Sequence, residues 1–433
     1  MRIFDSKGDG FKGFLKKRRL KQTGFTDKIQ QELKAVRLDI LDKGDEALSF
    51  YTEKFDKIKL SPPDFLVTNN ESNRALNSVN KEERTIIEKT IERVYDYHSK
   101  QRLQTWLNCD DSIITGQLIS PLNRVGVYVP GGKASYPSSV IMNAIPAKAA
   151  GVKEIIMVTP PTEKLNDYVI AAAVLCGIKK IYRVGGPQAI FALAYGTNTI
   201  PQVDKIVGPG NIYVATAKRM VYGDVDIDMI AGPSEIAIIC DEFADPKLVA
   251  IDMMSQAEHD EMAVSTLISS SAELIGEVKH ILPGLIKKED RKDIIEKSIN
   301  SNASLVLTGG IDESIELANE LAPEHLELYI KDPFEKLFLI KNAGAIFLGG
   351  NTPEAIGDYV AGPSHVLPTG GTARFFSPLD TVSFLKRTSV ISSSPDFLSK
   401  SAGDVKFFSD IEGLSAHGES VSFRVKKTKN NKN

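Results

Sequence analysis

The stretch that decides the fold runs from Arg124 to Gly132 and reads RVGVYVPGG. Its β-branched and aromatic residues end in a proline and two glycines, which is typical of a buried strand followed by a tight turn. Similar runs return at 154–159, 180–184 and 204–207, each followed by a helix-compatible stretch. Strands that alternate with helices predict a mostly parallel sheet covered by helices.

A second series of strand-like runs, again separated by helical segments, follows at 236–240, 263–269, 304–308, 326–330 and 345–348. We therefore expect an α/β protein with two Rossmann-like parallel-sheet domains. The turn-forming residues Ala231-Gly232-Pro233-Ser234 mark the boundary between them. Residues 26–108 show long polar–apolar periods, and we expect a helical N-terminal region that packs on the second domain.

Bulk composition narrows the class of protein. The 433 residues carry a formal net charge of -3, so no broad basic field favours nucleic acid as a partner. The lysine-rich stretches at 16–19 and 425–429 are expected to be solvated ends. We find no signal peptide and no membrane-length apolar run, and three scattered cysteines suit a reducing compartment, so a cytoplasmic protein is expected.

Three of the four strands of the first domain, the first, third and fourth, end in glycine-rich turns, Pro130-Gly131-Gly132, Gly185-Gly186-Pro187-Gln188 and Gly208-Pro209-Gly210-Asn211. Such turns lie at the carboxyl ends of parallel strands, where nucleotides bind. No G-x-G-x-x-G or Walker pattern fixes the nucleotide, and glycine can serve there merely to turn the chain. Tyr128, Gln188 and Asn211 add side chains that suit either a nucleotide site or a surface or capping role.

Histidines and carboxylates suggest a metal site. Gln256 and His259 stand three apart on an expected helix and so share a face. Asp358 lies in a segment whose glycines and proline predict a loop, and His417 lies near the end of the chain. Each alone is more typical of a solvated surface, but together their nitrogen and oxygen atoms suit a catalytic zinc ion.

The pair Glu324-His325 follows an expected helix and directly precedes a strand. Histidine titrates near neutrality, and partial burial can raise a glutamate towards the same range. We therefore interpret the pair as a proton-transfer site, with helix capping or a surface position as the alternative.

Six segments together resemble the histidinol dehydrogenase family, in order and from about residue 25 to about residue 425. They are Val127-Tyr128-Val129-Pro130-Gly131-Gly132, Val207-Gly208-Pro209-Gly210-Asn211, Ala231-Gly232-Pro233-Ser234-Glu235, Ser255-Gln256-Ala257-Glu258-His259, Pro323-Glu324-His325-Leu326 and His365-Val366-Leu367-Pro368-Thr369.

The resemblance implies a cytoplasmic homodimer that oxidises L-histidinol through L-histidinaldehyde to L-histidine, with two NAD molecules used in turn. It implies zinc held by Gln256, His259, Asp358 and the partner's His417. It also implies that His325 is the base that removes the alcohol proton and that Glu324 activates water. The positions implied to contact substrate are Ser234, Gln256, His259, Glu324, Asp358, His365, Glu412 and His417, and those implied to contact NAD are Tyr128, Gln188 and Asn211.

The expected domains follow from the patterns and the resemblance together. Residues 1–24 form an N-terminal extension, residues 124–235 bind NAD, and residues 25–123 with 236–380 bind metal and substrate. Residues 381–433 form a tail that crosses the dimer to the partner's active site, and each site is expected in the cleft between the two α/β domains.

Three other interpretations stay open on the sequence. A thiol-dependent aldehyde dehydrogenase would need a reactive cysteine, for which Cys240 at the end of an apolar strand is the candidate. A nucleotide-binding regulatory module would do no chemistry. A related enzyme could use the same zinc and NAD on another small alcohol.

Overall fold

The computed structural model describes residues 1–430 except Asp9, Lys12, residues 15–26, Asp111, residues 132–135 and Ala231. The basic stretch at 16–19, Gly132 and Ala231 therefore lie outside the described residues. The chain divides into a large unit, Met1–Gln101 with Leu122–Phe384, and a small unit, Arg102–Pro121 with Leu385–Asn433.

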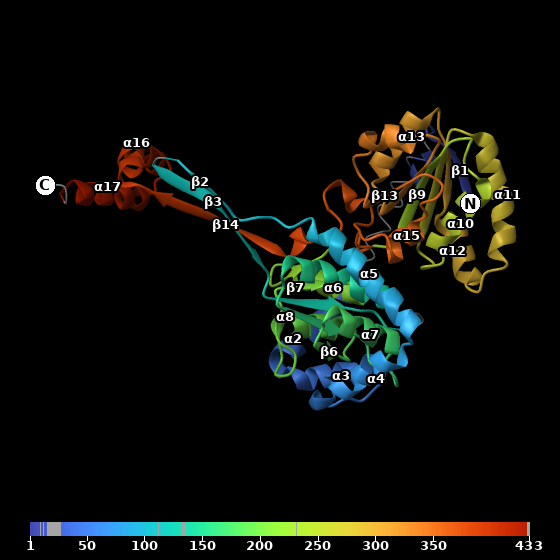
Figure 1. Cartoon of the computed structure of the whole chain (residues 1–433), viewed down its shortest axis with the longest axis horizontal. Helices are drawn as coiled ribbons and strands as arrows, with labels where there is room; N and C mark the ends of the chain where they lie inside the picture. The colour runs from blue at the N-terminus through green and yellow to red at the C-terminus, as the bar shows by residue number, and fades with distance from the viewer. Residues whose placement is uncertain are drawn as a thin grey trace. The chain divides into compact units, whose positions relative to one another are not determined.

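The first sheet of the large unit has five parallel strands in the order β6-β5-β4-β7-β8 (Figure 1). The strands are β4 (Arg124–Tyr128), β5 (Glu154–Val158), β6 (Lys180–Tyr182), β7 (Lys205–Val207) and β8 (Asp226–Ile227). The order reverses between β4 and β7. In doubly wound sheets ligands bind at the carboxyl ends of the strands beside this reversal, so the turns after β4 and β7 lie where a ligand is expected.

Helices from two parts of the chain cover this sheet. They are α2 (Asp27–Lys43), α3 (Asp45–Asp56), α4 (Asn69–Ser78), α5 (Lys81–Ser99), α6 (Pro137–Ala150), α7 (Asp167–Cys176), α8 (Gly186–Tyr195) and α9 (Ile212–Val221). One core joins α2 and α3 to α8 and α9, and another joins α4 and α5 to α6 and α7. The expectation that the N-terminal helices pack on the second domain is thereby corrected, because their apolar faces are buried against the first sheet.

The second sheet of the large unit has six parallel strands in the order β1-β11-β10-β9-β12-β13. The strands are β1 (Arg2–Asp5), β9 (Glu235–Cys240), β10 (Val264–Ser269), β11 (Ser304–Leu307), β12 (His325–Tyr329) and β13 (Ala345–Leu348). Its helices are α10 (Pro246–Ala257), α11 (Ala272–Ile286), α12 (Lys292–Asn302), α13 (Ile311–Leu321), α14 (Pro333–Lys336) and α15 (Glu354–Tyr359). The expectation of two parallel-sheet α/β domains is confirmed, and the N-terminal residues add an edge strand that the sequence analysis did not predict.

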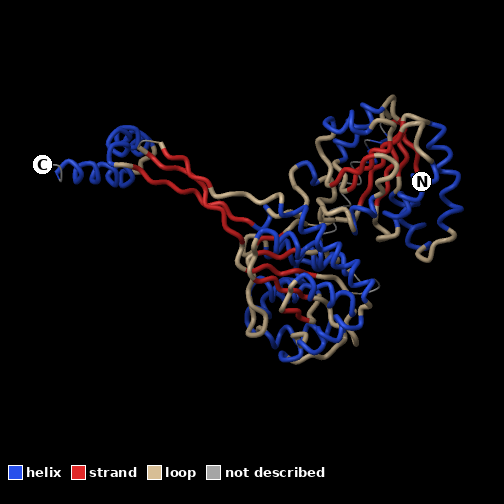
Figure 2. Tube along the Cα trace, viewed as in Figure 1, coloured by secondary structure: helices blue, strands red, loops and turns tan. Residues whose placement is uncertain are grey.

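The small unit is an antiparallel sheet with two helices (Figure 2). Its strands, in the order β14-β3-β2, are β14 (Leu385–Ser393), β3 (Ile113–Pro121) and β2 (Trp106–Cys109), and its helices are α16 (Pro395–Ile411) and α17 (Ser415–Asn430). Residues 106–121, which were expected to belong with the second domain, instead pair with the C-terminal segment. Among the described residues of this unit, no hydrophobic side chain is buried.

None of the described helices is both long enough and apolar enough to cross a bilayer.

Two leucines on α2 test the packing of the N-terminal helices. Leu33 is 2% exposed in the core shared with α8, whereas Leu38 on the same helix is 55% exposed. We expect Leu33→Ala to cost about 2–5 kcal/mol because it leaves a cavity, and Leu38→Ala to cost less than about 0.5 kcal/mol. Thermal unfolding followed by circular dichroism measures both, and equal midpoints for the two variants would contradict this packing.

Candidate functional site

The turn after β7 is built tightly against the end of β4. Gly208 has φ 111°, and a Cβ atom at this position would lie 2.0 Å from the carbonyl oxygen of Tyr128. Asp228 Oδ2 accepts the Gly208 N–H at 2.8 Å, and Lys218 Nζ donates to the Gly208 carbonyl at 2.9 Å. Lys218 and Asp228 also form a buried ion pair. Glycine is therefore required at residue 208, and the turn is held in place by charge.

The turn between β6 and α8 brings together two of the residues implied to contact NAD. The Gly186 N–H donates to Tyr128 Oη at 3.2 Å, and burial raises the pKa of Tyr128 to about 12. Gln188 is fully buried, and its Nε2 donates to Asp56 Oδ2 at 3.2 Å. Its Oε1 has no hydrogen-bond partner among the described residues.

Asn211, the third of these residues, begins α9. Its Oδ1 accepts the backbone N–H groups of Tyr213 and Val214, which is the usual arrangement of a helix cap. The capping alternative for Asn211 is thus realised. The exposed N-terminus of α9 presents backbone dipoles that favour an anion such as a phosphate.

A cavity of about 220 Å³ opens at the carboxyl ends of β4 and β5. Pro130, Gly131, Thr159 and Pro160 line it together with the start of α7. A hollow at this edge of a doubly wound sheet suits part of a nucleotide.

Glu324 and His325 stand at the amino end of β12, against the first residue of β9. The backbone N–H of Glu235 donates to Glu324 Oε2 at 2.9 Å. The Nδ1 atom of His325 lies 3.2 Å from the Glu235 carbonyl oxygen and 3.1 Å from Gln256 Oε1. Both partners are acceptors, so Nδ1 carries the proton of the neutral ring and Nε2 keeps its lone pair.

Burial sets the protonation of this pair. Desolvation, together with the nearby His259 and His365, lowers the pKa of His325 to about 3, although the contact with the Glu235 backbone opposes the shift. Desolvation also raises the pKa of Glu324 well above its usual range, although the hydrogen bond from Glu235 opposes the shift. The pair therefore combines a neutral imidazole with a carboxyl group that holds a proton more tightly than usual.

The expected metal ligands of the large unit converge beside His325. Asp358 Oδ1 lies 3.8 Å from His325 Nε2, and Gln256 contacts Nδ1 of the same ring. Ligand atoms of His259, Glu354 and Asp358 all lie within 4.8 Å of one another. Asp358 was expected in a loop, but it lies in the short helix α15, which presents Glu354 and Asp358 on one face at i and i+4.

The charge of this cluster fits a bound cation. Burial raises the pKa of Asp358 and, to well above its usual range, that of Glu354. No lysine or arginine of the described residues forms an ion pair with either carboxylate, and Glu354 Oε2 has no hydrogen-bond partner among them. A cation would supply the missing positive charge, and this set of nitrogen and oxygen donors suits zinc.

Two more expected substrate contacts border the cluster. His365 Nδ1 lies 3.0 Å from the Asp358 carbonyl oxygen, and burial lowers the pKa of His365 to about 4. Ser234 directly precedes β9, and its carbonyl oxygen accepts the Val264 N–H at 3.0 Å. Both side chains are half-buried.

Glu412 and His417 belong to the small unit. Glu412 follows α16 directly, His417 lies in the first turn of α17, and both are exposed. The residues brought together within the large unit are thus Ser234, Gln256, His259, Glu324, His325, Asp358 and His365. The predicted roles of Glu412 in substrate binding and of His417 in zinc and substrate binding stay predictions.

Two residues of these sites were not found from the sequence. Glu354 is 2% exposed, and its Oε1 lies 3.6 Å from His325 Nδ1. The i, i+4 spacing to Asp358 would have indicated it if a helix had been predicted there. Asp56 contacts Gln188 from a distant helix, and no local motif signals that contact.

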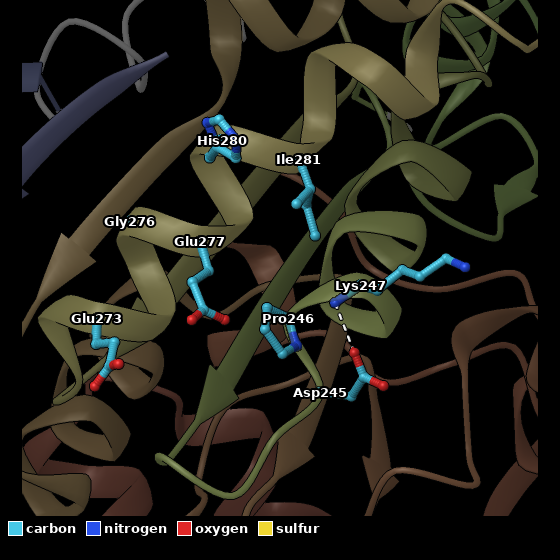
Figure 3. A pocket seen from close by; sticks show the side chains of 8 residues that line it. All are labelled: Asp245, Pro246, Lys247, Glu273, Gly276, Glu277, His280 and Ile281. Carbon is cyan, nitrogen blue, oxygen red and sulfur yellow. Dashed lines mark hydrogen bonds between the residues drawn. The ribbon is translucent and has the colours of Figure 1, made fainter.

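A second hollow, of about 570 Å³, lies at the start of α10 and along α11 (Figure 3). Glu273, Glu277 and His280 stand along one side of α11, and the hydrogen bond drawn is the cap from the Lys247 N–H to Asp245 Oδ1. No residue singled out as a site residue lines this hollow. We therefore do not assign it a function.

The cysteine required by the aldehyde dehydrogenase interpretation is not reactive. Cys240 is fully buried in β9, and burial raises its pKa well above the usual range. A thiol that stays protonated is a poor nucleophile. The structure therefore does not support thiol-dependent chemistry at Cys240.

Comparison with known proteins shows the family of the chain. The family profile described as histidinol dehydrogenase matches residues 19–425. The chain belongs to the histidinol dehydrogenase family. A histidinol dehydrogenase of Geobacter sulfurreducens is 50% identical over 401 residues, which cover 92% of this chain and 94% of that protein.

Two further members of the histidinol dehydrogenase family extend the comparison. The protein of Hydrogenovibrio crunogenus is 48% identical over 429 residues, or 98% of this chain and 99% of the relative. The crystal structure of histidinol dehydrogenase from Elizabethkingia anophelis has a TM-score of 0.89 at 34% identity, with 94% of each chain covered. The family resemblance and the fold class expected from the sequence are thus confirmed.

Next to the site, two more buried carboxyl groups share a hydrogen bond. Burial raises the pKa of Glu327 to about 8 and that of its neighbour Asp252 to about 6. Glu327 Oε1 also accepts the Glu354 N–H at 2.9 Å. The folded chain therefore holds a proton on this pair that the unfolded chain releases near pH 4.5.

This pair makes stability depend on pH. Because the folded pKa of Glu327 is raised, its contribution is complete at low pH and is lost as the pH rises towards about 8, at about 1 kcal/mol per pH unit. We expect Glu327→Gln, which stays neutral, to flatten the decline between pH 6 and 8. Thermal unfolding of metal-free protein measures this, with Glu316→Gln at an exposed position of α13 as control. A decline as steep in Glu327→Gln as in the control would refute it.

Proposed function

We propose that this member of the histidinol dehydrogenase family oxidises L-histidinol through L-histidinaldehyde to L-histidine, with zinc and two molecules of NAD, in cytoplasmic histidine biosynthesis. The observation that carries the proposal is the buried neutral His325, whose unprotonated Nε2 faces the carboxylate of Asp358 beside Gln256 and His259. The relatives' names support the choice of substrate.

Zinc would be held by Gln256, His259, Asp358 and the partner's His417. When bound, it would orient the substrate through its amine and imidazole nitrogen. The protein side of this site is preorganised within one unit, because Gln256 is buried in the last turn of α10, His259 follows the end of that helix and Asp358 lies in α15. The carboxylate of Glu354 would offset part of the charge of the ion and offers a further oxygen donor.

His325 acts as the base for the first oxidation. The Glu235 carbonyl and Gln256 Oε1 fix the proton on Nδ1, so the lone pair of Nε2 is directed to accept the alcohol proton. NAD supplies the hydride acceptor for each oxidation. Burial of the ring keeps the base neutral before each proton transfer.

Glu324 serves the second oxidation. Once deprotonated, the Glu324 carboxylate is a stronger base than an exposed one because burial raises its pKa, so it can take a proton from the water that adds to the aldehyde. The Glu235 N–H holds Oε2 in place and leaves the other carboxylate oxygen for this task. The hydrated aldehyde then loses a hydride and a proton, which yields the acid.

Substrate and cofactor would be bound by the side chains around these centres. The substrate would contact Ser234, Gln256, His259, Glu324, Asp358, His365, Glu412 and His417. NAD would contact Tyr128, Gln188 and Asn211, where Gln188 Oε1 lacks a partner and the end of α9 favours phosphate.

A homodimer with shared sites accounts for the small unit. Trp106, Leu107, Ile391 and Phe423 are each more than half exposed, and this sheet has no buried hydrophobic core among its described residues. A small sheet without a core needs a packing partner to be stable, and exposed apolar surface favours association. A second copy of the chain would cover this surface and receive Glu412 and His417.

One assay tests the proposed function. NADH formation by purified protein with L-histidinol is followed before and after a chelator and after zinc is restored, with product counted against substrate. We expect two NADH per histidinol, lost with the metal and regained with zinc. One NADH per substrate would refute the second oxidation, and no activity in zinc-loaded protein would point to another small alcohol. No nucleotide reduction with any alcohol would favour the regulatory interpretation.

Two histidine variants separate metal binding from proton transfer. His259→Ala is expected to lose zinc and activity together, because it removes a ligand. His325→Ala is expected to keep zinc while kcat falls by about 10²–10⁴, because only the base is lost. Zinc content per chain and single-turnover NADH formation measure the two effects. Normal zinc content in His259→Ala, or normal turnover in His325→Ala, would refute the role assigned to that residue.

Mixed dimers test the shared site. His259→Ala and His417→Ala are each expected to be inactive, because both residues bind the same ion. After the two variants are unfolded together and refolded, half of the dimers are mixed, and one of their two sites has both histidines. About one quarter of the wild-type activity should return. Failure to regain activity, with wild-type protein refolding normally in parallel, would contradict a site shared between subunits.

A further inference from the structure

A carboxylate reaches the turn after β6 from the N-terminal helices. Asp56 is the last residue of α3, and Lys57 ends the helix in a left-handed conformation with φ 61°. Asp56 Oδ2 accepts the hydrogen bond from Gln188 Nε2 at 3.2 Å. The side chain is half-buried, and burial raises its pKa to about 6. Asp56 is therefore negatively charged above that pH.

This charge has no compensating cation in the described part of the chain. Gln188 is its hydrogen-bond partner, and no described lysine or arginine forms an ion pair with it. The titratable group that it faces on β4 is Tyr128, which stays neutral because its pKa is about 12. Asp56 therefore makes the surroundings of this turn negative.

Gln188 directs a second acceptor into the same turn. Because Nε2 is engaged by Asp56, Oε1 points away from Asp56, and it is buried without a partner among the described residues. A Cβ atom at Gly186 would lie 2.5 Å from Oε1, so glycine leaves room beside this acceptor. A buried acceptor without a donor is costly, and a ligand hydroxyl or amide would satisfy it.

We propose that Asp56, together with Gln188, makes this turn select a dinucleotide with free ribose hydroxyls, such as NAD, over one that carries a 2′-phosphate, such as NADP. The inference rests on the proposed function, in which Gln188 contacts NAD. A carboxylate accepts hydrogen bonds from ribose hydroxyls, whereas a phosphate adds negative charge beside it and offers no such donor. Asp56 is thus a specificity-determining residue supplied by a helix outside the strand series of the nucleotide-binding sheet.

Binding of NADH and NADPH, measured by nicotinamide fluorescence with the full-length zinc-loaded dimer, tests this assignment. Asp56→Asn keeps the size and an acceptor but removes the charge, and Asp56→Glu keeps the charge. Asp42→Asn makes the same charge change at an exposed position of α2. We expect the ratio of NADH to NADPH affinity to fall by about tenfold in Asp56→Asn and to stay near the wild-type ratio in Asp56→Glu and Asp42→Asn.

The outcomes separate this inference from the proposed function. An unchanged ratio in Asp56→Asn, or an equal loss of both ligands in a variant that melts like wild type, would overturn the specificity role of Asp56. If the wild-type dimer bound neither nucleotide, the nucleotide site itself would fail, and the specificity role with it. A fall in ratio as large in Asp42→Asn would show that net charge alone is responsible, which also overturns the assignment.

Discussion

The proposed catalytic centre depends on the backbone of Glu235. Its N–H holds the carboxyl group of Glu324, and its carbonyl oxygen faces Nδ1 of His325. Its side chain is buried, and Oε1 accepts the N–H groups of Gly370 and Gly371. The parallel pairing of β9 with β12, which sets His325 opposite Ile236, fixes these contacts. The protonation of Glu324 and His325 thus follows from the register of two strands and the desolvation around them.

The two proposed binding regions lie at different ends of their strands, one at the carboxyl ends of the first sheet and the other at the amino ends of the second. The nucleotide turns follow β4, β6 and β7 at the carboxyl ends of the first sheet, as doubly wound folds lead one to expect. The residues proposed to bind metal and transfer protons lie at the amino ends of the second sheet, where Glu324 and Ser234 precede their strands and His259 follows α10. The rule that ligands bind at the carboxyl ends of parallel strands would have placed no site at these amino ends. The histidine, glutamate and aspartate side chains, rather than the topology, indicated the second site.

The hydrophobic pattern of the sequence was enough to predict the central strands, because a buried parallel strand needs a continuous apolar run between turn residues. The same pattern could not predict which distant segments pair. Strands β3 and β14 lie far apart in the sequence but pair with each other, and nothing in either segment specifies its partner. The apolar faces of α2 and α3 predict burial but not the surface that buries them. Asp358 was predicted in a loop because the glycines and proline of the surrounding segment disfavour a helix. The folded chain nevertheless forms the short helix α15 there. Asp56 and Glu354 became visible only through contacts between distant segments.

The central claim is that one zinc ion sits where Asp358, His259 and Gln256 converge beside His325. Anomalous diffraction at the zinc edge, from crystals of zinc-loaded protein, measures this most directly. The account predicts one strong peak per chain within bonding distance of His259 and Asp358, completed by the partner's His417. A peak elsewhere, such as the hollow lined by Glu273, Glu277 and His280, or no peak at all, would contradict it.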